Sequence, residues 1–526
     1  MTILQAALIA AYYGFFASQP LILLMGPSNF GAIIGLIVGA ILGDASTGVM
    51  FGAWIQVTML GVVNYGGTKP VDQFAACIIA IPIAIAADLP VGIAIVLASL
   101  FGAVSFPIDN LWKKINTEYL TPRIDNAIVN GNYGAITRLS GLWPMLIRFF
   151  LSGIPAFLLL MLGMPLMELF MHYCPIGLRS GLSSAGMLLP ALGTALFLCK
   201  IGRPKLLPFF IAGYFAALCF ELPILAVASF SVLLAVLYDR EMERSEAENR
   251  TPPAKPVSPP MANDSARRVP KTLLWRCELK LAFLHMTCQT NDRGYVNAFT
   301  AAMLPILKYL WNGTEDAEAH IREGLERTRS YYLCEQSFST VAFSIIAGME
   351  EKLRNREIPT ATMIPATRSA IMGPMSGLGD TLHGSTSRQI AIGLTLPLCI
   401  KGSVASAIAM LLLMNITPWA TVIYGVPRGY AQGAPFILGL VRSGKLQRFA
   451  ALASPAIAFI IGIGAATWLM PACMCIPDLN IALPGLLGLI CIGVYALLIR
   501  KKVSINKQML ATLLLCVLIF GLQGFF

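Results

Sequence analysis

The chain has 526 residues, of which 56% are hydrophobic and only 12% are charged, and its mean hydropathy is +0.72. This composition excludes an ordinary soluble globular protein and indicates a polytopic membrane protein. The net charge is +11, but the basic residues lie in short connectors between apolar runs, such as Lys113-Lys114 and 500–502. The positive-inside rule explains such basic clusters, and the alternative is that they bind lipid headgroups. We predict no nucleic-acid partner.

Apolar segments follow one another along most of the chain. A helix needs roughly 20 apolar residues to cross a bilayer. Ten stretches approach or exceed that length: 2–25, 30–62, 74–107, 144–170, 180–199, 206–238, 389–414, 449–471, 481–499 and 509–526. The first basic residue is Lys69, so the first stretch lacks the charged start of a cleaved signal peptide and we expect a retained helix.

Cysteine and histidine spacing gives no sign of a metal or cofactor. The twelve cysteines include no CxxC pair, and most lie inside apolar runs, where they behave as small hydrophobic side chains. The four histidines form no HExxH pattern. We therefore predict no metal, no cofactor and no disulfide framework.

A polar segment at 239–271 divides the chain into two bodies. It contains mixed charges followed by dense proline, which is typical of a flexible tether. The first body, 1–238, is nearly all membrane. The second, 272–526, begins with charged amphipathic or interfacial helices at 272–357 and continues as a membrane part at 358–526. We predict an all-α polytopic membrane protein whose two membrane bodies, with broken or re-entrant helices, are joined by a polar linker.

Two glycine-rich polar segments interrupt the apolar runs. The first spans 43–48, and the second spans 373–388 and also carries a carboxylate, a histidine and an arginine. Polar, irregular backbone at membrane depth is tolerated only where it is buried in protein or lines a water-filled path. We therefore expect structural turns and a route for a polar solute at these segments; the predicted turn residues are Gly43, Asp44, Gly48, Gly373, Gly377 and Gly379.

The motifs in both bodies resemble the mannose family of the bacterial phosphoenolpyruvate-dependent sugar phosphotransferase system. The first body is similar to enzyme IIC in the order of its motifs: Gly43-Asp44 with Thr47-Gly48, Gly61 to Gly66, Asp72, Gly131-Asn132, Ile154 to Ala156, and Leu207 to Phe210. The second is similar to enzyme IID in the run Met372 to Asp380, with Thr386, Arg388 and Gly429-Tyr430. The resemblance implies a fused IIC and IID permease.

This resemblance implies a division of labour. The membrane bodies would import a hexose-like sugar, and a separate cytoplasmic IIB protein, supplied by IIA, would phosphorylate it. Neither body shows a P-loop or a phosphate-carrying histidine, so we predict no catalytic residue in this chain. The resemblance also implies homotrimers, an elevator-type motion, and a place among the lipids of the bacterial inner membrane. The alternatives are an ion-coupled secondary sugar transporter and, with Asp44 and Asp380 paired, an intramembrane enzyme.

Polar residues beside the broken helices are the candidates for sugar binding, because carboxylates and amides engage vicinal hydroxyls. In the first body we select Gln56, Asn64 and Asp72. Asn64 lies beside Gly66 and also suits a turn, and Asp72 follows Pro70 and also suits a helix cap.

The candidates in the second body are Asn291, Asp292, Glu335, Gln336, Asp380, His383 and Arg388. Asp380 and Arg388 have an alternative as a structural ion pair, since pairing is the usual way to bury either charge. His383 has an alternative as a polar filler. The sequences Leu333-Cys-Glu-Gln336 and Gly379-Asp380-Thr381 depart from the family's usual pattern, which puts mannose itself in doubt as the substrate.

Overall fold

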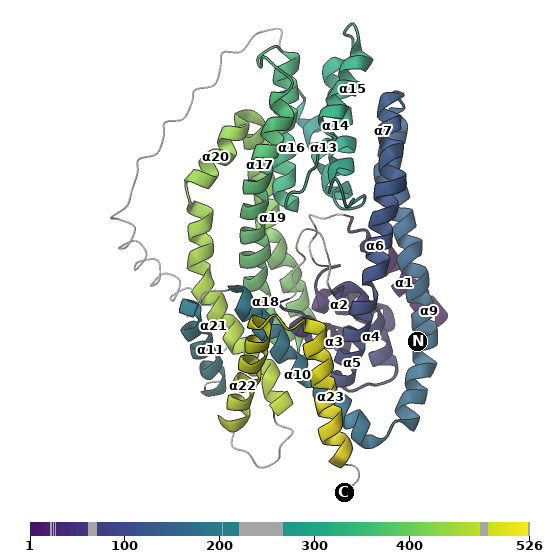
Figure 1. Ribbon diagram of the computed structural model, residues 1–526, viewed down its shortest axis with the longest axis vertical. Coiled ribbons are helices and arrows are strands. Elements are labelled where there is room, and N and C mark those ends of the chain that lie inside the picture. The colour runs from purple at the N-terminus through teal and green to yellow at the C-terminus, as the bar shows by residue number, and fades with distance from the viewer. Residues whose placement is uncertain are drawn as a thin grey trace, which may run out of the picture.

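The computed structural model describes residues 1–20, 24, 26, 28–61, 71–201, 204–219, 267–473 and 482–523. The regular elements within these residues are helices, which confirms the predicted all-α fold. Two helical bundles lie end to end in an elongated molecule, and long helices run between them (Figure 1). Residues 220–266, which include most of the predicted linker, lie outside the described residues.

The first bundle, which we call the C core, is built on a tight helical hairpin. It comprises α1 (Ile3–Ala17), α2 (Gly31–Leu42), α3 (Ala45–Thr58), α4 (Gln73–Ala86), α5 (Val91–Val104) and α10 (Ile176–Ile201). Gly43 ends α2 with φ at 93°, a left-handed conformation that glycine adopts without a Cβ penalty. Asp44 then caps α3 by accepting a hydrogen bond from the Thr47 N–H at 3.0 Å. The predicted turn at Gly43 and Asp44 is present, so the predicted span 30–62 is two helices, whereas the turn predicted at Gly48 is wrong because Gly48 lies within α3.

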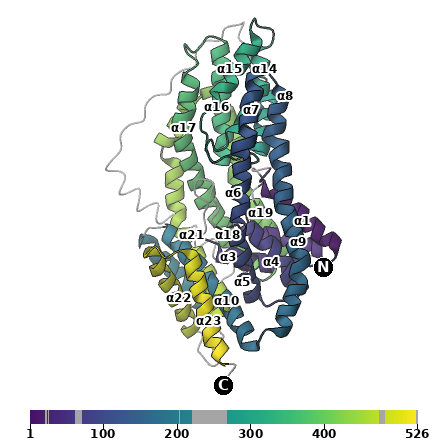
Figure 2. The same cartoon turned by 45° about the vertical axis from the view of Figure 1, so that its right-hand side comes forward.

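A long helical hairpin leaves the C core and enters the second bundle (Figure 2). Its outgoing limb is α6 (Phe106–Ile115), a π-helical stretch (Asn116–Leu120) and α7 (Thr121–Val129). Its returning limb is α8 (Tyr133–Thr137), a second π-helical stretch (Arg138–Leu142) and α9 (Trp143–Tyr173). We call residues 106–142 the C arm.

The second bundle, the D head, consists of α13 (Lys271–Leu284), α14 (Val296–Trp311), α15 (Ala317–Arg327) and α16 (Gln336–Arg354). α15 keeps a charged face exposed, as its sequence pattern predicts. α14 differs, because nearly all of its side chains are buried, including those of Asn297 and Thr300. α14 is therefore the centre of the D head and not one of its surface helices.

From the D head, α17 (Met363–Gly379) continues through a π-helical stretch (Asp380–Ser387) into α18 (Arg388–Cys399) without interruption. The predicted turns at Gly373, Gly377 and Gly379 are therefore wrong, because the polar run is accommodated by π-helical winding inside a long helix. A tight connection at residues 400–403 instead separates α18 from α19 (Val404–Gln432), so the predicted span 389–414 is also two helices. We call residues 388–414 the D arm.

The remaining helices lie at the outer flank of the molecule. They are α11 (Leu207–Cys219), α20 (Ala434–Arg442), α21 (Lys445–Cys473), α22 (Ala482–Arg500) and α23 (Ile505–Gln523), with a short 3-10 turn (Pro204–Leu206) before α11. Five helical runs in the described residues are long and apolar enough to span a membrane: Val91–Val129, Tyr133–Tyr173, Ile176–Cys199, Val404–Gln432 and Lys445–Met470.

Each body buries its arm in the other body. The C-arm residues Ile124, Ile128 and Ile136 belong to the same apolar cluster as the D-head helices. Conversely, Ile392 and Met410 of the D arm belong to the apolar cluster of α2, α3 and α10. The two bodies are thus interlocked, and neither completes its core without the other.

Polar contacts reinforce the junction of the C arm with the D head. Asp125 of α7 pairs with Arg329 at 2.7 Å and with Arg293 at 3.0 Å. Asn116, in the first π-helical stretch, donates to the Gln289 carbonyl at 3.0 Å. The π-helical windings of the C arm therefore lie where it crosses the other body.

Close packing within the α2–α3 hairpin predicts a strict requirement for glycine. A Cβ on Gly48 would lie 2.2 Å from the Gly35 carbonyl oxygen, so Gly48→Ala forces two backbones apart. We expect Gly48→Ala to lower the stability by about 1–3 kcal/mol, as overpacking does, measured by thermal unfolding in detergent. Gly377→Ala is the matched control, since a Cβ at this position meets nothing within 4 Å. Alanine in place of glycine should raise the stability of this helix by about 0.5–1 kcal/mol. Equal melting temperatures for both variants would contradict the tight hairpin.

Candidate functional site

The N-terminus of α2 brings together candidate residues from both bodies. Gln56, at the end of α3, reaches back so that its Oε1 accepts a hydrogen bond from the Ala32 N–H at 3.1 Å. Arg388 of the D arm places its guanidinium 4.7 Å from the ring centroid of Phe30, which caps α2. Gln73 begins α4, and its Nε2 lies close to Gly31 at the start of α2, since a Cβ built on Gly31 would be 3.1 Å from it. We call Gln56, Gln73 and Arg388 the α2 cluster.

Two donors of the α2 cluster have no hydrogen-bond partner in the structure. They are Gln73 Nε2 and Arg388 Nε, and both atoms are buried. An unsatisfied buried donor costs about 1–3 kcal/mol. A ligand that brings oxygen acceptors to this point recovers that free energy, so the arrangement suits a polyhydroxylated molecule.

The other first-body candidates lie close to this cluster along the chain. Asp72 precedes Gln73, and its Oδ1 caps α4 by accepting from Phe74 N–H at 3.0 Å and Ala75 N–H at 3.4 Å. Its carboxylate oxygen is thereby engaged in holding the helix, the alternative that the sequence left open. Asn64 lies outside the described residues.

A second polar group forms in the D body, where α16 meets the π-helical stretch. Glu335 caps α16, and its Oε2 accepts from the N–H groups of Ser337 and Phe338, each at 3.1 Å. Its Oε1 lies 3.2 Å from His383 Nδ1, and His383 Nε2 lies 3.1 Å from Thr421 Oγ1. His383 is 2% exposed. We call Glu335, Asp380 and His383 the Glu335 cluster.

Charge in the Glu335 cluster is partly compensated. Burial acts to raise the pKa of Glu335, but the His383 contact and the two backbone N–H donors together hold it below its ordinary value. Partial burial and the neighbouring Glu335 carboxylate raise the pKa of Asp380. Burial lowers the pKa of His285, which lies near Glu335, to about 4 and keeps that imidazole neutral. The two carboxylates of the cluster therefore have pKa values shifted in opposite directions, that of Glu335 downward and that of Asp380 upward.

The structural pair expected between Asp380 and Arg388 does not form. Asp380 begins the π-helical stretch Asp380–Ser387 and Arg388 follows it, and no ion pair between the two occurs among the described residues. Arg388 faces Phe30 of the C core, whereas Asp380 belongs to the Glu335 cluster. The winding of this helix thus assigns the two charges to different groups.

Three further candidates serve other contacts. Asn291 is exposed, and its backbone N–H donates to Thr117 Oγ1 of the C arm at 3.0 Å. Asp292 is also exposed and lies 3.5 Å from Arg293 Nε. Gln336 donates to Met286 Sδ at 3.7 Å. The structure therefore places Asn291 and Asp292 at the junction of the C arm with the D head, away from both polar clusters.

Gln73 is the site residue that the sequence interpretation missed. A signal was present, because an acid followed by glutamine occurs at the start of a buried helix in each body, as Asp72-Gln73 and Glu335-Gln336. Both acids cap their helices with a carboxylate oxygen. Within the described part of the chain no group of three histidine, cysteine or acidic side chains gathers in a way suited to a metal ion.

The Glu335 cluster predicts a pH-dependent stability. Because the folded-state pKa of Glu335 lies below its ordinary value near 4.5, its stabilisation is fully present above pH 4.5 and is lost as the pH falls further. We expect Glu335→Gln to destabilise the protein by about 1–2 kcal/mol at pH 7 and the difference from wild type to shrink below pH 4.5, in thermal unfolding across pH. Glu323→Gln, at an exposed site, is the control. A difference that stays constant with pH would contradict the ionised contact.

Comparison with known proteins gives the two bodies separate relatives. The family model described as the PTS system sorbose-specific IIC component matches residues 3–237. The model described as the PTS system mannose/fructose/sorbose family IID component matches residues 268–526.

Individual relatives agree with this division. The chain is 24% identical over 211 residues to the fructose permease IIC component of Bacillus subtilis, covering 40% of this chain and 78% of the relative. It is 28% identical over 205 residues to the mannose-specific EIIC component of Escherichia coli K12, covering 38% of this chain and 76% of the relative. The fructose permease IID component of Bacillus subtilis is 24% identical over 177 residues, covering 34% of this chain and 62% of the relative.

Two solved structures are also similar, each at 20% identity over 49% of this chain and 97% of the other. One is described as a membrane protein, with a TM-score of 0.41, and the other is the mannose transporter ManYZ with microcin E492, with a TM-score of 0.30. The family models and the permease relatives together cover both bodies. The chain belongs to the mannose family of phosphotransferase-system sugar permeases and carries a IIC domain and a IID domain in one polypeptide.

Proposed function

We propose that this chain imports a hexose-like sugar across the bacterial inner membrane and that a separate IIB protein, supplied by IIA, phosphorylates the sugar. The IIC and IID relatives are named for fructose, mannose and sorbose, which supports a sugar of this size. Five apolar helical runs support a multi-pass location. By analogy with the family we expect the fused chains to work as a homotrimer.

The α2 cluster is the observation that carries this proposal. Gln56 and Gln73 of the IIC domain meet Arg388 of the IID domain at one helix N-terminus, and two of their donors are free. A sugar hydroxyl accepts from such donors and donates in turn to an amide oxygen. The helix N-terminus adds further positive potential for an oxygen ligand. We propose that the sugar binds here, between the two domains.

The Glu335 cluster is the second group of polar side chains along the proposed sugar path. Glu335 and Asp380 present carboxylates that accept from sugar hydroxyls, and His383 sits between Glu335 and Thr421. The D arm and the α2–α3 hairpin share one apolar cluster, so they are suited to move together as a rigid element. In this proposal that element carries the sugar toward the IIB protein.

Phosphoryl transfer is assigned to the partner proteins. His285 and His383 are each at most 2% exposed and lie inside the D body, out of reach of a docking phosphoryl donor. His320 lies 4.0 Å from Glu323 and stacks on Trp311. These three histidines thus have structural surroundings, and the chemistry is expected from IIB.

Substitution at Gln73 tests the proposed sugar site. Gln73→Leu keeps the side-chain volume but removes the free donor, so we expect sugar binding to weaken about tenfold, as for the loss of one hydrogen bond. The measurement is calorimetric titration of the purified chain with a panel of hexoses. Gln432→Leu, at the exposed end of α19, is the matched control. Unchanged affinity in Gln73→Leu with an unchanged melting temperature would place the sugar elsewhere.

Reconstitution tests the division of labour. Vesicles that contain this chain alone should bind sugar but accumulate no sugar phosphate, and addition of the IIA and IIB proteins with the phosphoenolpyruvate-dependent enzymes should start accumulation. An uncoupler should leave the rate unchanged, because no ion gradient is used. Uptake that an uncoupler abolishes and that ignores phosphoenolpyruvate would instead favour the ion-coupled transporter.

A further inference from the structure

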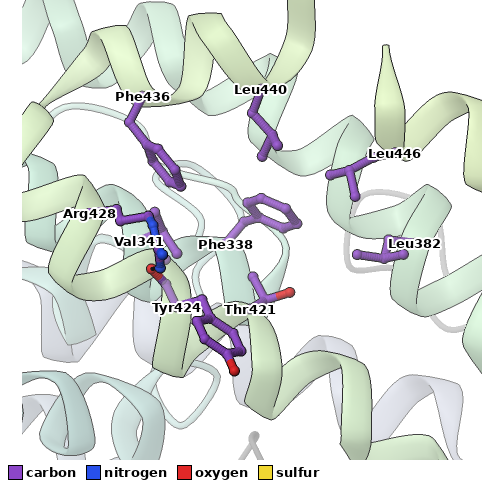
Figure 3. A pocket seen from close by; sticks show the side chains of 10 residues that line it. Phe338, Val341, Leu382, Thr421, Tyr424, Arg428, Phe436, Leu440 and Leu446 are labelled. Atoms are coloured by element: carbon purple, nitrogen blue, oxygen red, sulfur yellow. Dashed lines mark hydrogen bonds between the residues drawn. The ribbon is translucent and has the colours of Figure 1, made fainter. Parts of the chain in front are cut away.

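An apolar pocket opens on the outer flank of the D body, beneath α20 (Figure 3). Its volume is about 260 Å³. Phe436 and Leu440 of α20 form one wall, and Phe338 of α16 projects toward its centre. Leu382 and Leu446 close one side, and Tyr424 and Arg428 of α19 line the other.

The lining fits an alkyl chain and does not fit a sugar. Two lining residues, Thr421 and Tyr424, carry hydroxyls, and that of Thr421 already contacts His383 Nε2 at 3.1 Å. The Arg428 guanidinium donates one hydrogen bond, from Nη1 to the Tyr424 carbonyl at 3.0 Å. Its other N–H groups remain available to a ligand. A polyhydroxylated ligand would leave most of its hydroxyls without partners here, which is unfavourable.

The pocket lies at the level where two membrane spans end. The run Val404–Gln432 ends just after Arg428, and the run Lys445–Met470 begins just before Leu446. α20 connects these two ends, bounded by Gly433 with φ at 67° and Gly444 with φ at 62°. The pocket therefore lies where one candidate membrane span ends and the next begins.

The stretch of chain at the mouth of the pocket is basic, whereas the acidic residues near the pocket, Glu335 and Asp380, belong to the Glu335 cluster on the side of its floor. Between residues 381 and 477 the sequence contains no aspartate or glutamate. Arg428, Arg442, Lys445 and Arg448 all fall in the short stretch that forms the mouth, and the first three are exposed. Basic residues at a span end attract anionic lipid headgroups by about 1 kcal/mol each.

We propose that this pocket is a binding site for an anionic phospholipid, whose acyl chain fills the space beneath α20 and whose headgroup lies against Arg428 and Lys445. The floor of the pocket is shared with the Glu335 cluster, because the Phe338 ring packs at 5.8 Å from the His383 ring and Thr421 contacts the same imidazole. A bound acyl chain therefore fixes the position of His383. The proposal is independent of which sugar is carried.

Photocrosslinking tests the site in the full chain. The protein is placed in phosphatidylcholine nanodiscs that contain a trace of phosphatidylglycerol with a diazirine on its acyl chain, and crosslinked peptides are mapped by mass spectrometry. We expect labelling of peptides from α16, α19 and α20. The phosphatidylcholine probe with the same diazirine should label them about 30-fold less, the factor for about 2 kcal/mol of headgroup attraction to Arg428 and Lys445 together.

Matched variants separate this site from bulk lipid. Leu440→Trp fills the pocket and should abolish the labelling, whereas Leu438→Trp, on the exposed side of the same helix, should not. Arg428→Gln leaves the pocket open and should reduce labelling about fivefold, with Lys501→Gln as the control at another exposed base.

Three results would overturn the proposal. They are equal labelling by the two probes, labelling that Leu440→Trp leaves intact, and displacement of the probe by inorganic phosphate, which would indicate a site for soluble anions. Arg428→Gln changes an exposed side chain, so it remains informative if the Leu440→Trp protein does not elute as a single species.

Discussion

The mutual burial of the two arms is the constraint on which the rest of this structure depends. Ile124 and Ile136 of the C arm are fully buried among the D-head helices, and Ile392 and Leu396 of the D arm lie in the core of the IIC domain. Between helices in a bilayer, association rests on close packing and hydrogen bonds more than on the hydrophobic effect. Each domain therefore needs the other to fill its interior, and a single polypeptide supplies the two in equal number.

The interlock also creates the polar groups that we connect with transport. Arg388 reaches Phe30 only because the D arm lies inside the IIC domain, and the free donors beside Gln56 face the boundary between the two domains. The Glu335 cluster arises in the same way within the D body, where a π-helical stretch turns His383 toward the cap of α16. π-helical windings are common at functional positions because they redirect side chains without ending a helix. The three π-helical windings among the described residues lie in or beside the two arms.

Local chemistry explains why part of the interpretation from sequence succeeded. Gly43-Asp44 specifies a helix end and a helix start within two residues, through a left-handed glycine and a capping carboxylate, and both are present. The polar run at 373–388 contains the same dipeptide, Gly379-Asp380, yet its backbone stays helical there, so the dipeptide alone does not decide whether the helix ends. Gln73 was missed because nothing in its local sequence shows that its amide ends beside Gly31 of another helix.

The sequence by itself determined the all-α membrane class and the family motifs, because these follow from composition and short motifs. Tertiary structure alone decided which candidates meet. It brought Gln56 to Met410 and Arg388 to Phe30 across the two domains, it brought Glu335 to His383, and it assigned Asp380 and Arg388 to separate groups. The physical reason is that these contacts join residues up to several hundred positions apart, and their geometry depends on how each arm packs within the other domain.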